Sequence, residues 1–77
     1  MDQRIFELGL SVPATSLYLL MTALSDGGAS LNRANVVNVW NAPPEQLDQA
    51  FAELVARGVA GADPDGSWFV RPFADWR

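Results

Sequence analysis

The segment from residue 47 to residue 71 constrains the fold most, because it combines an apolar helical stripe, a glycine and a turn-forming tetrapeptide. The residues expected to face the core from this helix are Leu47, Ala50, Phe51, Leu54 and Val55. Gly58 ends the helix, since glycine adopts a left-handed φ without a Cβ clash. Asp63-Pro64-Asp65-Gly66 then predicts a tight turn between strands at 59–62 and 67–71. The segment therefore predicts a helix followed by a β-hairpin.

Two further helices are expected before this segment. The first begins near Ser11, a suitable N-cap, with Pro13 tolerated in its first turn, and ends at Gly27 and Gly28. Its core stripe is Leu17, Leu20, Met21 and Leu24. A shorter helix follows from about Asn32 to Trp40, and its expected inward residues are Val36, Val37 and Trp40. Pro44 lies in the first turn of the third helix.

Four asparagines recur every third residue between positions 32 and 41. This spacing drifts by about 60° per step around a helix of 3.6 residues per turn, so the four do not share one face. We expect Asn32 and Asn41 to cap the two ends of the second helix, and Asn35 and Asn38 to be solvated.

Both ends of the chain carry aromatic residues. Residues 1–10 form an N-terminal arm, helical or extended, that packs on the body through Phe6 or Leu8. Strand alternation places Trp68 and Val70 on one face of the hairpin and Phe69 on the other. We favour Trp68 and Val70 as the inward pair; the opposite register would place Phe69 inward. Residues 72–77 form an aromatic tail, packed on the body or at an interface.

Length and charge narrow the classes of protein. Seventy-seven residues make one domain, and the 49% apolar content is ample for a core. Nine carboxylates and five arginines give a net charge of −4, which opposes non-specific binding to nucleic acid or acidic lipid. No apolar run approaches the roughly 18 residues of a membrane span, and the start lacks a signal-peptide layout. A cytoplasmic protein without membrane association is expected.

The chain lacks the usual catalytic and metal-binding side chains. Histidine, cysteine and lysine are absent, so the serines have no conventional base to activate them. Asp63 and Asp65 resemble the start of a calcium loop, but the twelfth position, which needs a bidentate acid, is Ala74. Gly27-Gly28 is not followed by the lysine of a phosphate loop. We expect neither an enzyme, nor a metal site, nor a cofactor.

The order helix, turn, helix, hairpin, together with the segment LVARGVAGADPDGSWFV, resembles the winged helix-turn-helix family. The resemblance covers about residues 11–71 and implies an α+β fold, a small winged-helix domain of three helices followed by a two-stranded β-hairpin wing. Many members are transcription regulators whose third helix enters the major groove while the wing touches the DNA backbone. The family fold also serves as an adaptor domain in larger assemblies.

The charges decide between these two functions. Three of the six solvent-facing residues expected on the third helix are carboxylates, and the wing tip carries two more, where DNA-binding wings tend to be basic. We favour an interaction module for a protein partner, either an adaptor or a small acidic inhibitor that imitates nucleic acid towards a basic surface. Its expected contact residues are Glu45, Asp48, Gln49, Glu53, Asp63 and Asp65.

The alternative is a DNA-binding regulator that acts as a dimer. Its expected nucleic-acid contacts are Arg33, Gln46, Gln49, Arg57 and Arg71, in which the glutamines would contact bases. Aromatic side chains are enriched at interface cores, so Phe6, Phe73 and Trp76 are the expected dimer contacts.

Overall fold

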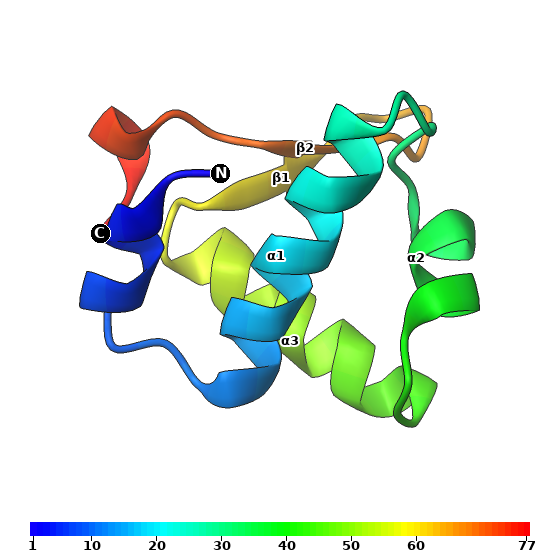
Figure 1. Cartoon of the computed structure of the whole chain (residues 1–77), viewed down its shortest axis with the longest axis horizontal. Coiled ribbons are helices and arrows are strands. Elements are labelled where there is room, and N and C mark those ends of the chain that lie inside the picture. The colour runs from blue at the N-terminus through cyan, green and yellow to red at the C-terminus, as the bar shows by residue number, and fades with distance from the viewer.

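The elements occur in the order that the sequence predicts. The computed structural model describes all 77 residues (Figure 1). Its helices and strands are α1 (Val12–Asp26), α2 (Arg33–Val39), α3 (Pro44–Ala56), β1 (Ala60–Ala62) and β2 (Trp68–Val70). Two short 3-10 helices, η1 (Gln3–Glu7) and η2 (Phe73–Asp75), lie near the ends of the chain. The predicted fold class is confirmed: a small α+β domain of three helices and an antiparallel hairpin, in a winged-helix-like layout.

The helix ends follow from local chemistry. The Ser11 hydroxyl accepts a hydrogen bond from the Ala14 amide at 3.3 Å and so caps α1. Asn32 caps α2 in the same way, through its side-chain oxygen and the Asn35 amide at 2.8 Å. Gly58, with φ of +70°, follows the end of α3 and turns the chain into β1.

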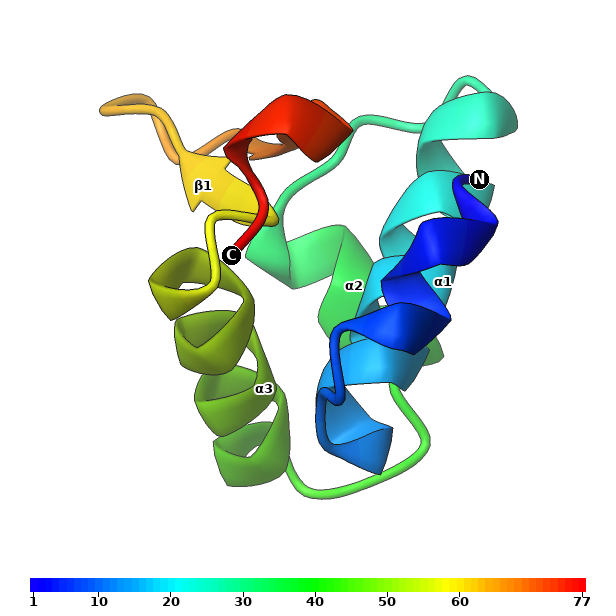
Figure 2. The ribbon, with the colours of Figure 1, turned by 90° about the vertical axis from the view of Figure 1, so that its left-hand side faces the viewer.

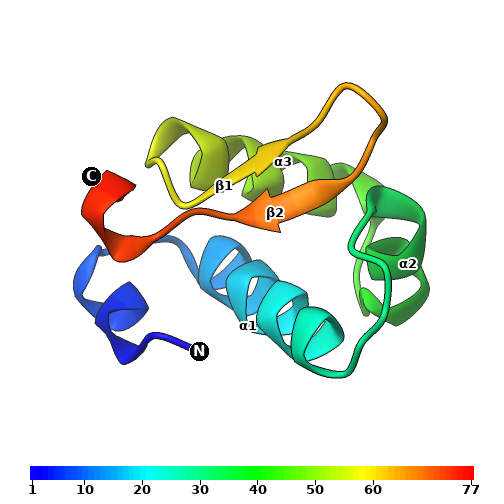
Figure 3. The same cartoon turned by 90° about the horizontal axis from the view of Figure 1, so that it is seen from above.

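The core lies between α1, α3 and the hairpin. Helices α1 and α3 lie side by side (Figure 2), and seen from above the hairpin crosses over them, with β1 nearer α3 and β2 nearer α1 (Figure 3). The buried core residues are Ile5, Ala14, Leu17, Tyr18, Met21, Val36, Leu47, Ala50, Leu54, Val59 and Ala60. Helix α2 contributes only Val36 to this set, so α1 and α3 supply most of the core.

The inner face of the hairpin carries Trp68 and Val70, the pair that the sequence analysis favours. Ala60 pairs with Val70 and Ala62 with Trp68, so Trp68 and Val70 face the core, against which both pack. The Trp68 ring stacks on Phe51 of α3 with centroids 3.9 Å apart and planes 13° from parallel. The Trp68 amide also donates to the Leu31 carbonyl at 2.8 Å, which ties the segment before α2 to the wing.

The two ends of the chain meet on one side of the domain (Figure 1). Ile5 is fully buried, and the Asp2 amide donates to the Tyr18 hydroxyl at 3.0 Å. The Trp76 ring packs edge-on against Tyr18, with centroids 5.6 Å apart, and its indole N–H donates to the Arg71 carbonyl at 2.9 Å. The N-terminal arm and the C-terminal tail therefore both pack on the body.

Of the two residues expected to anchor the N-terminal arm, Leu8 is confirmed, because it packs partly buried against the core, whereas Phe6 is 58% exposed. Ile5, which is fully buried, also anchors the arm. The expected burial of Val55 was wrong. Val55 is 43% exposed because it lies about 100° around α3 from Leu54, beyond the narrow stripe that meets α1.

The predicted asparagine roles also need correction. Trp40, not Asn41, occupies the C-cap of α2, because the chain turns into extended geometry there before the two prolines. Asn35 is hydrogen-bonded rather than simply solvated, since its side-chain amide donates to the Ser30 carbonyl at 2.7 Å.

Candidate functional site

Helix α3 presents half of the polar residues that the sequence nominates. Glu45, Asp48 and Gln49 are exposed, while Gln46 and Glu53 are partly buried. Glu45 lies in the first turn, where a negative charge is favoured by the helix dipole. The acids on α3 thus share a helix, but they have different surroundings.

Asp48 is paired with Arg33. The Arg33 Nε and one terminal nitrogen donate to the two carboxylate oxygens at 2.8 and 3.0 Å, a bidentate arrangement between the start of α2 and α3. These hydrogen bonds lower the pKa of Asp48 and raise that of Arg33. Both side chains are about half exposed, so the pair contributes little to stability. Its main consequence is that Arg33 and Asp48 neutralise each other.

Glu53 is held by the start of α1. Its carboxylate accepts from the Ser11 hydroxyl at 2.7 Å and from the Ser11 backbone amide at 2.8 Å. These two hydrogen bonds lower the pKa of Glu53 below its ordinary value, and the bond from the hydroxyl has the larger effect. Glu53 is therefore ionised at neutral pH and fixed in position.

The wing tip is organised by its own turn. The Asp63 amide donates to the Ser67 carbonyl at 2.8 Å, and the Asp65 carboxylate accepts from the Ser67 amide at 2.9 Å. The latter bond is the main reason why the pKa of Asp65 is lowered. Both acids are exposed, so the wing tip is a negatively charged loop distinct from the α3 acids.

The arginines nominated for DNA contact lie at the ends of different elements. Arg57, at the end of α3, donates to the backbone carbonyls of Leu8 and Arg77. Arg71, after β2, pairs with Asp75 at 3.2 Å. Arg33 binds Asp48, which lies nine residues before Arg57, a separation of about 13 Å along the helix direction. All three cations already have acceptors within the chain.

The residues nominated for dimer contacts lie where the two ends meet. Phe6 is 58% and Phe73 40% exposed, and the Arg4 guanidinium lies 3.5 Å from the centroid of the Phe73 ring. Arg4 also binds Asp2, and this hydrogen-bonded pair lowers the pKa of Asp2 to about 2. Trp76 contacts both Tyr18 and Phe73. Of the three nominated residues, Phe73 and Trp76 therefore already have aromatic partners within the chain.

Sequence reasoning missed two adjoining grooves beside α1 and α3. The apolar groove has a volume of about 430 Å³ and lies between α1, the end of α2 and the start of α3; it is lined mainly by Val12, Pro13, Leu20, Val39, Trp40 and Gln46. The polar groove, of about 280 Å³, is lined by Ser11, Pro13, Gln46, Gln49, Ala50 and Glu53. The helical stripe assigns Leu20 to the core, but Leu20 lines the apolar groove. An apolar stripe residue left without a covering element is the sequence signal for this groove.

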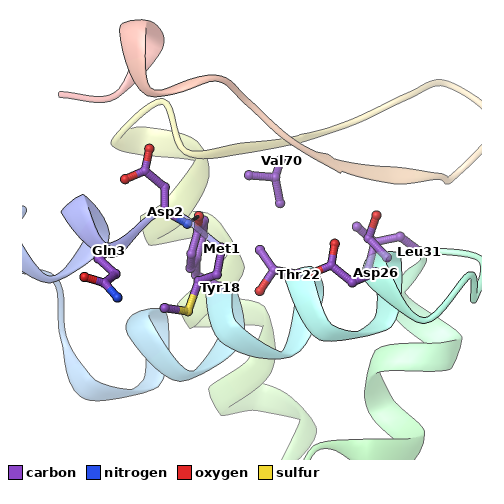
Figure 4. A pocket seen from close by; sticks show the side chains of 9 residues that line it. Met1, Asp2, Gln3, Tyr18, Thr22, Asp26, Leu31 and Val70 are labelled. Atoms are coloured by element: carbon purple, nitrogen blue, oxygen red, sulfur yellow. Dashed lines mark hydrogen bonds between the residues drawn. The ribbon is translucent and has the colours of Figure 1, made fainter.

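A third hollow, of about 570 Å³, lies between the N-terminal arm, α1 and β2 (Figure 4). Two of its hydroxyl groups already have partners: the Tyr18 hydroxyl accepts from the Asp2 amide, and the Thr22 hydroxyl donates to the Leu19 carbonyl at 2.9 Å. The Asp2 carboxylate is bound by Arg4. Tyr18, Thr22 and Asp2 are therefore already engaged within the fold.

Comparison with known proteins gives no relative for this chain: no protein-family model, curated protein or solved structure matches it. None of its helices has the length and apolar character needed to cross a lipid bilayer.

Proposed function

We propose that the protein is a non-enzymatic interaction module that binds a basic protein partner through the acidic side of α3 and the wing tip. The observation that carries this proposal is the internal pairing of the arginines. Arg33, Arg57 and Arg71 are held by acceptors of the same chain, and for Arg33 and Arg71 the acceptor is a carboxylate that offsets the positive charge and so weakens the attraction to a phosphate.

The distribution of negative charge supports the same proposal. Glu45 on α3 and Asp63 on the wing are exposed, Glu53 remains ionised, and the whole chain carries a net charge of −4. Such a surface attracts a basic partner and increases the rate of encounter with it. An adaptor role and an inhibitor that imitates nucleic acid both use this chemistry.

The alternative, a dimeric DNA-binding regulator, is favoured by the winged-helix-like layout alone. In that function α3 would lie in the major groove with Gln46 and Gln49 towards the bases. Because Gln46 is partly buried and lines the two grooves, only Gln49 of this pair is exposed.

Two measurements test the proposed function. Fluorescence anisotropy of labelled duplex DNA over a salt series is expected to show no specific binding, even at low salt. Affinity capture from the source cells is expected to retain a basic protein, and the double variant Glu45→Lys, Asp63→Lys should lose it. These two acids are chosen because both are exposed and neither belongs to an ion pair of the fold. Sub-micromolar, steeply salt-dependent binding of DNA would instead establish the regulator.

A further inference from the structure

The apolar groove and the polar groove adjoin each other, because both are lined by Pro13 of α1 and Gln46 of α3. We infer that together they form one docking trough for a segment of a basic protein, which inserts a large apolar side chain at one end and a lysine or arginine at the other. This inference rests on the proposed function and names the surface and the chemistry of the partner segment.

The trough has a regular floor. On α3, Gln46, Gln49, Ala50 and Glu53 follow the i, i+3, i+4, i+7 pattern of a single helical face. On α1, Pro13 and Leu20 line the apolar groove together with Ser16. The trough is therefore built largely on the two helices that form most of the core, with the end of α2 closing its apolar part.

The apolar end exposes side chains that the fold does not cover. Val12 is 79% and Val39 46% exposed, and both line the apolar groove beside Trp40. Neighbouring exposed apolar residues around a concave surface are typical of a site that receives an apolar anchor. No charged side chain lines this groove, so a charged group would lose its hydration there without compensation.

The acidic end supplies the charge complementarity. The two Glu53 oxygens accept one hydrogen bond each from Ser11, whereas a carboxylate has about four acceptor positions. Arg57, four residues further along α3, donates to the carbonyls of Leu8 and Arg77. Glu53 therefore keeps acceptor capacity and a negative charge for a lysine or arginine of the partner.

The distance between the two ends defines the segment. Gln46 and Glu53 are seven residues apart on α3, a rise of about 10 Å. A partner segment can match this with residues i and i+7 of a helix, or i and i+3 of an extended strand. The expected sequence pattern is thus an apolar residue and a basic residue at one of these two spacings.

The test uses the full chain as bait for a displayed library of random peptides. Enriched peptides are expected to share the apolar–basic pattern. An enriched peptide is then synthesised, and its affinity is measured by isothermal titration calorimetry for the wild-type chain and four variants.

The variants form two matched pairs. Val39→Glu places a charge in the apolar groove, while Val55→Glu makes the same change at a valine of similar exposure outside both grooves. We expect Val39→Glu to weaken binding by about tenfold or more and Val55→Glu by less than about twofold. Glu53→Gln keeps an acceptor for Ser11 but removes the charge, and should weaken binding by about three- to tenfold at low salt, whereas Glu45→Gln should have little effect.

Several results would overturn the trough. Equal losses from Val39→Glu and Val55→Glu would place the peptide elsewhere. Failure of the library to enrich any sequence would mean that the trough does not bind such a segment. Self-association that Val39→Glu abolishes, seen by analytical ultracentrifugation, would mean that a second copy occupies the groove. If peptides bind but respond only to Glu45→Gln, the proposed function survives and the trough does not. DNA binding without peptide binding would refute both the trough and the proposed function.

Discussion

Gly58→Ala probes how the C-terminal tail is fixed to the end of α3. Gly58 has φ of +70°, and a Cβ added there would overlap the backbone carbonyl oxygen of Asp75. A non-glycine residue in left-handed geometry costs about 1–2 kcal/mol by itself. The overlap adds to this cost, because neither the added Cβ nor the Asp75 carbonyl oxygen belongs to a flexible side chain that could move aside. The tail must therefore move away from α3.

The cost of moving the tail can be estimated from Trp76, which is partly buried and packs against the core. Emptying a fully buried aromatic site costs about 3–5 kcal/mol, so losing part of this contact should cost roughly 2 kcal/mol. Gly66→Ala is the matched control, since Gly66 has φ of +91° but open space around its missing Cβ. It should show the φ penalty alone.

Thermal unfolding by circular dichroism measures the difference between the two variants. A further 2 kcal/mol corresponds to a melting temperature about 8–16 °C lower for Gly58→Ala than for Gly66→Ala, at the scale of a domain this small. The Trp76 indole N–H resonance should also shift in Gly58→Ala, because its bond to the Arg71 carbonyl depends on the tail. Equal melting temperatures with an unshifted indole resonance would refute the placement of the tail over Gly58.

Three further predictions concern single side chains. Phe51→Ala should destabilise the fold by about 2–4 kcal/mol, somewhat less than at a fully buried site, because it removes the stacking partner of Trp68; an unchanged chemical-denaturation midpoint would contradict this. Since the pKa of Glu53 is lowered by folding, its contribution to stability is present above about pH 4.3 and is lost as the pH falls through the folded-state pKa. Glu53→Gln should therefore flatten the acid limb of the stability–pH profile, and an unaltered limb would exclude the role of Ser11. Trp76→Phe should cost about 1 kcal/mol more than Trp40→Phe, because only the Trp76 indole N–H donates to an acceptor of the chain; urea titration of both variants measures the difference, and equal costs would argue against the bond to Arg71.

The fold could be predicted because its signals are local. Ser11 and Asn32 cap their helices a few residues away, and the Asp63–Gly66 turn joins two neighbouring strands. Strand alternation then fixed Trp68 and Val70 on the core side. Each of these interactions spans only a few residues, which is the range over which sequence patterns carry most information.

The partners of the charged side chains could not be predicted in the same way. Ser11 and Glu53 are 42 residues apart, and the bond from Arg57 to the Leu8 carbonyl spans 49. Helical periodicity shows that Glu53 is on the polar side of its helix, but not which element lies opposite. For this reason the sequence nominated Arg57 as a DNA contact and Glu53 as a free acid, although the fold gives both of them partners.

The docking trough arises from a mismatch of helix lengths, which also explains why sequence patterns missed it. Helix α1 has 15 residues and α2 only 7, or about 22 and 10 Å. A helix as short as α2 cannot cover the whole of α1, and Trp40 then turns into extended geometry towards the prolines. Leu20 has the periodicity of a core residue, yet the helix that would cover it has already ended near Val39. An apolar stripe predicts a buried face only where another element is long enough to cover it, and here the uncovered part is where we place the partner.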